Sequence, residues 1–119
     1  DAPLLVPQIE AIDLFAPAGS DVPWQVVDVR RPAEYAAGHV PGALSCELGS
    51  AMPVAALGPL DRSRPTAVLC EGGYRSSAAL RQLRAAGFTD LCNVHDGMRG
   101  WRGNHLPQAQ GGPATATSS

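Results

Sequence analysis

The residues best suited to chemistry lie in one short segment, CEGGYRSS, residues 70–77, which runs into the helix-like sequence AALRQLRAAG. Its cysteine, Cys70, carries a thiol. An ordinary thiol has a pKa of about 8.5 and is mostly protonated at neutral pH, so a nucleophilic cysteine needs positive potential around it. Two features would supply that potential: the N–H groups and dipole of a helix N-terminus, and the guanidinium of Arg75.

Small residues in the same segment would shape its backbone into a cradle for an anion. Gly72 and Gly73 permit positive φ and add no bulk, so backbone N–H groups can turn inward. Ser76 lies where a hydroxyl caps the helix or donates into the cradle. A cysteine at the end of a buried strand is usually a small hydrophobic residue. Here the glycines, Arg75 and the immediate helix together favour a reactive Cys70 over that alternative.

The elements expected around this segment alternate between strands and helices. The patterns predict strands over residues 25–29, 43–48, 66–69 and 90–94, and helices over residues 9–15, 31–37, 52–57, 75–86 and 98–102. This alternation predicts an α/β fold with a mainly parallel central sheet and helices on both faces. Ligands bind such sheets outside the carboxyl ends of the strands, which is where Cys70 would lie.

The length of 119 residues fits a single domain, which we expect over residues 1–107, followed by a disordered small-residue tail over residues 108–119. The formal net charge of -2, from nine basic and eleven acidic residues, gives no reason to expect nucleic acid or a membrane as a partner. The sequence shows neither a membrane-spanning apolar run nor a signal-peptide pattern. We therefore expect a cytoplasmic protein, with a periplasmic protein or a piece of a longer one as the alternatives.

Three cysteines, at positions 46, 70 and 92, cannot all pair and form no Cys-x-x-Cys motif. A disulfide scaffold and a zinc site are therefore unfavoured, and we expect neither a metal nor a cofactor. Cys46 and Cys92 fall in expected strands, where a core role is favoured over that of a resolving thiol.

Three segments of the chain resemble the rhodanese domain, the sulfurtransferase fold. These are DVRRPAEYAAGHVPGA at residues 28–43, CEGGYRS at residues 70–76 and VHDGMRGWRGNHLP at residues 94–107. The last departs from the family pattern, because Asp96-Gly97 replaces two glycines and Asn104-His105 replaces the glycine before the final proline. The loop is also similar to those of rhodanese domains fused to metallo-β-lactamase-fold persulfide dioxygenases.

The resemblance implies that Cys70 takes a sulfane sulfur as a persulfide and passes it on in a ping-pong mechanism. The donor would be thiosulfate or a low-molecular-weight persulfide, the acceptor a thiol or cyanide, and the partner a fused or separate protein of sulfur metabolism. Arg75 would bind an anionic donor. The backbone N–H groups that would hold the sulfur belong to Glu71, Gly72, Gly73, Tyr74, Arg75 and Ser76. The family positions that chiefly brace the fold correspond to Asp28, Arg30, Glu34 and His39.

Two other functions remain open. Cysteine phosphatases and arsenate reductases typically place five residues between cysteine and arginine, whereas four lie between Cys70 and Arg75 here, which suits a sulfur atom better than a phosphate. A non-catalytic docking or sensing domain is the second alternative, although inactive members commonly lose the cysteine. Glu71 is expected to face solvent and to repel anionic acceptors.

Overall fold

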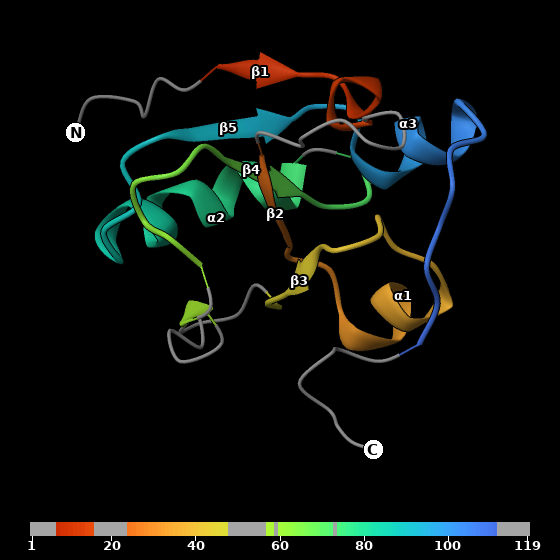
Figure 1. Ribbon diagram of the computed structural model, residues 1–119, viewed down its shortest axis with the longest axis horizontal. Coiled ribbons are helices and arrows are strands. Elements are labelled where there is room, and N and C mark those ends of the chain that lie inside the picture. The colour runs from red at the N-terminus through yellow and green to blue at the C-terminus, as the bar shows by residue number, and fades with distance from the viewer. Residues whose placement is uncertain (1–6, 16–23, 48–56, 59, 73, 112–119) are drawn as a thin grey trace.

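The computed structural model contains one five-stranded sheet in which every pairing is parallel and the strand order is β1-β5-β4-β2-β3 (Figure 1). It describes residues 7–15, 24–47, 57–58, 60–72 and 74–111. The strands are β1 Gln8–Ile9, β2 Gln25–Asp28, β3 Leu44–Ser45, β4 Thr66–Leu69 and β5 Leu91–Val94. The helices are the 3₁₀ helix η1 Ala11–Leu14, α1 Pro32–Ala37, α2 Tyr74–Ala85 and α3 Gly97–Gly103. The predicted α/β class is confirmed.

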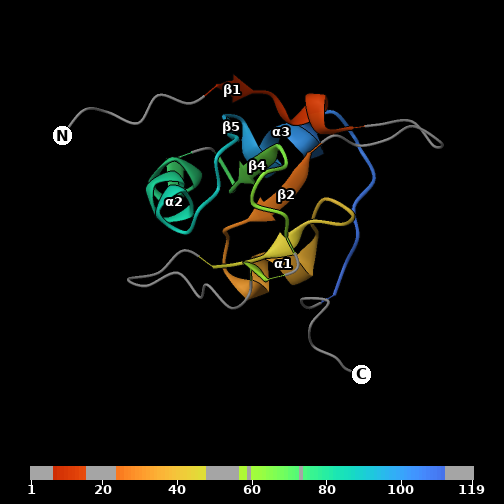
Figure 2. The same cartoon turned by 60° about the vertical axis from the view of Figure 1, so that its left-hand side comes forward.

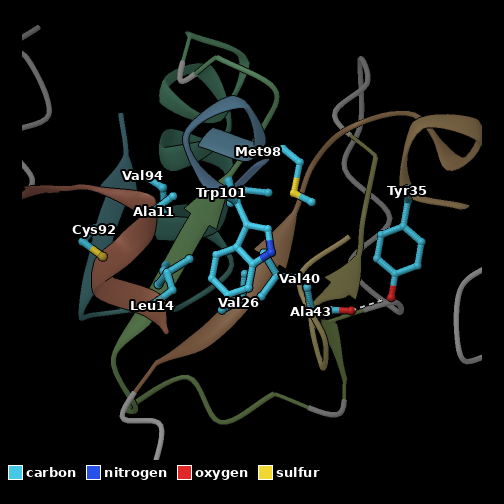
Figure 3. Close-up of a cluster of buried hydrophobic side chains, with 12 residues drawn as sticks. Ala11, Leu14, Val26, Tyr35, Val40, Ala43, Cys92, Val94, Met98 and Trp101 are labelled. Carbon is cyan, nitrogen blue, oxygen red and sulfur yellow. Dashed lines mark hydrogen bonds between the residues drawn. The ribbon is translucent and has the colours of Figure 1, made fainter. Parts of the chain in front are cut away.

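The two faces of the sheet pack against different helices (Figure 2). Successive side chains of a strand point to opposite faces, and the central strands are apolar at both, as parallel sheets require. One face packs under η1, α1 and α3, where Leu14, Val26, Val94, Met98 and Trp101 lie in one buried cluster (Figure 3). The other packs under α2, where the cluster includes Val27, Val68, Cys70, Leu83 and Phe88. Helices therefore cover both faces, as predicted.

Helix α2 follows the pattern read from its sequence. Ala79, Leu80 and Leu83 lie on one stripe and are buried against the sheet. The helix ends before Gly87, whose φ of 105° is the left-handed conformation that favours glycine. No helix in the described part of the chain has the length and apolar character needed to cross a bilayer.

The helix predicted over residues 9–15 is wrong. Ile9 belongs to β1, and the backbone there bonds to β5: Asn93 N–H donates to Pro7 and His95 N–H to Ile9. A short 3₁₀ turn follows, with Leu14 buried and Phe15 exposed. Backbone pairing with an open sheet edge thus overrode the helical spacing. Most of the helix expected over residues 52–57 lies outside the described residues. Of the strand expected over residues 43–48, the described residues 43–47 contain β3, and residue 48 lies outside the described part.

The C-terminal segment continues past Pro107, the end predicted for the domain, and contacts α1 there. It runs from α3 to α1 (Figure 1), where His39 and Ala109 exchange two backbone hydrogen bonds of 2.9 Å and Gly111 N–H donates to Ala36. The Trp101 indole N–H donates to the Pro107 carbonyl at 2.7 Å. Residues 108–111 therefore lie beside α1. We call residues 104–111 the C-terminal strap.

Helix α3 begins directly against the end of β4. The backbone N–H groups of Met98 and Arg99 donate to the carbonyls of Cys70 and Glu71 at 2.8 and 3.0 Å. Gly97 makes this approach possible: its φ is 57°, and a Cβ there would lie 2.6 Å from the Glu71 oxygen and nearer still to that of Cys70. The glycine thus fixes the backbone of the cysteine segment.

Replacing Gly97 by alanine should therefore lower the free energy of unfolding by at least about 1–3 kcal/mol, the usual cost of a strained backbone conformation. Urea denaturation measures the change. Gly103→Ala is the matched control in the same helix, because a Cβ there meets no atom within 4 Å. Equal stability of the two variants would contradict the packing described here.

Candidate active site

Cys70 is the first residue after β4, at the carboxyl edge of the sheet, and α2 begins four residues later. Its exposed fraction is 0%, and it belongs to the core cluster under α2. The cysteine is thus held between a buried strand and a helix N-terminus, whose dipole and N–H groups favour an anion. This placement is the one expected from the sequence.

A buried arginine joins the structural motif at residues 28–43 to the cysteine segment. The Arg30 side chain is 2% exposed and donates through Nε and Nη2 to the carboxylate of Asp28, which is fully buried. Nη2 also donates to the Gly38 carbonyl at 2.8 Å, and Nη1 lies 3.5 Å from the Glu71 carboxylate. Arg30 therefore connects the ends of β2, α1 and β4.

Glu71 is held by two arginines. Besides Arg30, its carboxylate accepts a close hydrogen bond from Nη2 of Arg102 in α3. The Glu71 side chain is 26% exposed. The side chain is therefore partly exposed to solvent, as expected, but the fold also brings Arg102 beside it. Its negative charge is compensated, which weakens the expected repulsion of anions.

Arg75 and Glu34 form a second ion pair, across 41 positions of the sequence. The two terminal nitrogens of Arg75 donate to the two Glu34 oxygens at 2.8 and 3.0 Å. This bidentate bond with Arg75 lowers the pKa of Glu34 to about 2, and the hydrogen bond from Arg31 N–H adds to the effect. An anionic donor would have to compete with Glu34 for Arg75, so donor binding by Arg75 stays a prediction.

The other members of the predicted cradle lie around the start of α2. The buried Ser76 hydroxyl donates a close hydrogen bond to the Asn93 side chain of β5, whose amide donates to Gln8 in β1. The serine side chain thereby ties α2 to the sheet. Gly72 is half-buried, Tyr74 is the first residue of α2, and Gly73 lies outside the described residues.

His39 lies in a packed, hydrogen-bonded position. Its ring stacks on Tyr35, with 3.6 Å between centroids, and Nδ1 lies 2.8 Å from the Tyr35 carbonyl. The Tyr35 hydroxyl in turn donates to Ala43 at 2.6 Å (Figure 3). These contacts hold α1 against the chain that leads to β3, as expected for a residue that braces the fold.

The other two cysteines are core residues, as predicted, and none of the three forms a disulfide. Burial raises the pKa of the Cys46 thiol. Burial, together with the nearby Asp90 and Asp13 carboxylates, raises the pKa of the Cys92 thiol to about 12. Both thiols are therefore poor nucleophiles.

Neither of these thiols is placed to bond with Cys70. Cys46 and Cys70 each follow a residue paired with Asp28, so β2 runs between them and their Cα atoms are roughly 10 Å apart, two strand spacings. A disulfide needs about 7 Å or less. Cys92 belongs to the cluster on the opposite face of the sheet.

An open pocket of about 280 Å³ borders the cysteine segment. Its lining consists of Arg30, Glu34, Ala37, Gly38, Glu71, Arg102 and Gln108. Two arginines and two glutamates therefore surround one depression, and the strap closes one side of it.

Arg102, Gln108 and Asn93 were missed from the sequence. Each lies in a separate segment and meets the site only through the fold: Arg102 at the end of α3, Gln108 on the strap and Asn93 within β5. Of these three residues, only Asn93 carried a sequence signal, because it is a polar residue within an otherwise apolar strand.

The rhodanese-like domain model matches residues 14–104 of the chain. The chain belongs to the rhodanese-like family. The thiosulfate sulfurtransferase GlpE of Pseudomonas putida is 32% identical over 109 residues, which are 92% of this chain and 94% of that protein. YrkF of Bacillus subtilis is 32% identical over 98 residues, 82% of this chain, and the chain spans about half (52%) of the length of YrkF.

Solved structures agree with this membership. A thiosulfate sulfurtransferase from Pseudomonas aeruginosa superposes with a TM-score of 0.72 at 26% identity, over 91% of this chain and 21% of the other. A rhodanese-like domain from Anabaena sp. gives 0.63 at 28% identity, over 72% of this chain and 86% of the domain. The resemblance stated from the sequence is confirmed, and the rhodanese-like domain of this chain is of the sulfurtransferase family. Its resemblance to domains fused to persulfide dioxygenases stays a prediction.

The Glu34–Arg75 pair should make stability depend on pH. Because the folded-state pKa of Glu34 is lowered from 4.5 to about 2, the pair stabilises the fold fully above pH 4.5 and loses this effect as the pH falls towards 2. Urea denaturation between pH 7 and pH 3 should show a shallower loss of stability for Glu34→Gln than for the unaltered protein.

The control variant is Glu47→Gln, which removes an exposed carboxylate outside the pair. It should retain the pH dependence of the unaltered protein. Identical curves for Glu34→Gln and the unaltered protein would show that the pair does not act on the folded state.

Proposed function

We propose that this rhodanese-like domain transfers a sulfane sulfur from a small donor to a thiophilic acceptor through a persulfide on Cys70. The observation that carries the proposal is the position of Cys70, between the carboxyl end of β4 and the N-terminus of α2 in a domain of this family. Thiosulfate is the donor proposed first, since the name of the Pseudomonas putida relative specifies it.

The two half-reactions balance without a cofactor. The Cys70 thiolate attacks the outer sulfur of thiosulfate, a new S–S bond forms, and sulfite leaves with the electron pair of the broken bond. Cyanide or a thiolate then attacks the terminal sulfur. The bond to Cys70 breaks, its thiolate is regenerated, and thiocyanate or a new persulfide leaves.

The chain's own residues support this chemistry by holding the segment that carries the sulfur. Backbone N–H groups of residues 71–76, at the start of α2, would stabilise the terminal sulfur anion as helix N-termini stabilise other anions. Carbonyls at positions 70 and 71 are fixed by α3, so the segment is shaped before the donor arrives.

The positions of the other thiols favour an external acceptor. Cys46 follows β3, on the far side of β2 from Cys70, and Cys92 lies on the opposite face of the sheet, so neither is placed beside the proposed persulfide. The sulfur would therefore leave on a small molecule or on the thiol of a separate or fused protein of sulfur metabolism. We propose a cytoplasmic location, because the reaction needs Cys70 as a reduced thiol and a reducing compartment keeps thiols reduced.

Intact-protein mass spectrometry after incubation with thiosulfate tests the proposal. The unaltered protein should gain the mass of one sulfur atom, and cyanide should remove it. Cys70→Ser should gain nothing, whereas Cys46→Ala and Cys92→Ala should still gain the sulfur.

No gain with thiosulfate or with a low-molecular-weight persulfide would overturn the proposal. A gain that persists in Cys70→Ser would assign the sulfur to another thiol and would also contradict it.

A further inference from the structure

We propose that the pocket beside Glu71 binds the non-reacting end of the acceptor, and that it selects a thiol carrying both a carboxylate and an ammonium group. The inference rests on the proposed sulfur transfer and adds the chemical class of the acceptor. Its basis is the set of charges around the pocket, where Arg30, Arg102, Glu34 and Glu71 line one depression and Glu71 directly follows Cys70 in the chain.

The burial of Cys70 leaves recognition to the surroundings of the cysteine segment. Its exposed fraction is 0%, so the Cys70 side chain offers an acceptor no surface of its own for binding. The pocket begins at the next residue, Glu71, and its volume of about 280 Å³ is close to the smaller ligand sites of proteins, about 300 Å³. A small acceptor bound there lies beside the segment that carries the sulfur.

Arg102 is the group in this pocket best placed to bind a carboxylate. Arg30 is buried and already bound to Asp28 and the Gly38 carbonyl. The Arg102 side chain is 42% exposed and bonds to Glu71, and both residues line the pocket. An incoming carboxylate can therefore take the place of the Glu71 carboxylate on Arg102.

That exchange determines which ligands are favoured. A ligand with a negative charge alone would take Arg102 from Glu71 and leave a half-buried carboxylate with weaker compensation, which costs free energy. A ligand that also carries an ammonium group returns a positive charge to Glu71 in the same step. The alternating charges of the pocket therefore favour a zwitterionic thiol over an anionic one.

Gln108 adds a neutral wall to the pocket. The strap places its carboxamide against Gly38, where a Cβ would overlap Oε1 of Gln108. A carboxamide both donates and accepts hydrogen bonds, so it can face either charge of a zwitterion without penalty.

The test measures how fast a preformed persulfide is discharged by four thiols. The protein is loaded with thiosulfate, freed of excess donor, and mixed with cysteine, 3-mercaptopropionate, cysteamine or 2-mercaptoethanol. These thiols carry both charges, the carboxylate alone, the ammonium alone, or neither. Each variant is compared with the unaltered protein for the same thiol, so differences in thiol reactivity cancel.

Arg102→Ala should slow discharge by cysteine about tenfold, the size of one lost charge-assisted hydrogen bond, and leave 2-mercaptoethanol unchanged. Arg102→Lys should retain most of the cysteine rate. Glu71→Gln should slow cysteine and accelerate 3-mercaptopropionate, because Arg102 is then free for the carboxylate. Arg84→Ala, on the exposed side of α2, is the control and should change none of the four rates.

Equal effects of Arg102→Ala on all four thiols, or none on cysteine, would overturn the assignment of the pocket. So would a Glu71→Gln variant that slows cysteine and 3-mercaptopropionate alike. Failure of the persulfide to form in the unaltered protein is a different result, which removes the sulfur-transfer proposal itself.

Discussion

The structure depends on one buried charge, the guanidinium of Arg30. Removing such a group from water costs several kcal/mol unless it is paired and fully hydrogen-bonded. Arg30 meets that demand by binding Asp28 at the end of β2, the Gly38 carbonyl after α1, and Glu71 after β4. Three segments must therefore hold fixed positions to provide the partners of this one side chain, and the cysteine segment is among them.

The cysteine segment is constrained from both faces of the sheet. On one side α3 donates two backbone hydrogen bonds to it, at a distance that only a glycine at position 97 permits. On the other, Arg75 and Ser76 tie the start of α2 to α1 and to β5. The polar side chains near the cysteine mostly hold the backbone in place, so in the proposed reaction the backbone N–H groups would bind the sulfur. This arrangement, in which side chains position the backbone and backbone N–H groups bind the anion, suits a reaction that moves one sulfur atom and needs no proton relay.

The elements that position Cys70 could be predicted from the sequence because their signals are local. The apolar run of β4, the stripe of α2 and the stop at Gly87 each lie within one short window. The helix expected over residues 9–15 was wrong because β1 takes its conformation from pairing with β5, and no local sequence pattern encodes that pairing. The same holds for the strap, whose small polar residues resemble a tail until His39 and α1 offer them partners.

The site itself was only partly predictable. Motif spacing predicted Cys70 as the reactive residue and predicted the residues that brace it. The partners of Glu71 and Arg75, however, come from segments 31 and 41 positions away. No local sequence pattern indicates which residue such a charged side chain will contact in the folded chain. The pocket and Arg102 became visible only once α3 and the strap were placed.

The central claim is a covalent intermediate on Cys70, and steady-state kinetics tests it most directly. Initial rates of thiocyanate formation would be measured at varied thiosulfate and several fixed cyanide concentrations. Because the donor's product leaves before the acceptor reacts, the account predicts parallel double-reciprocal lines. Lines that intersect, showing both substrates bound together, or an absence of turnover would contradict it.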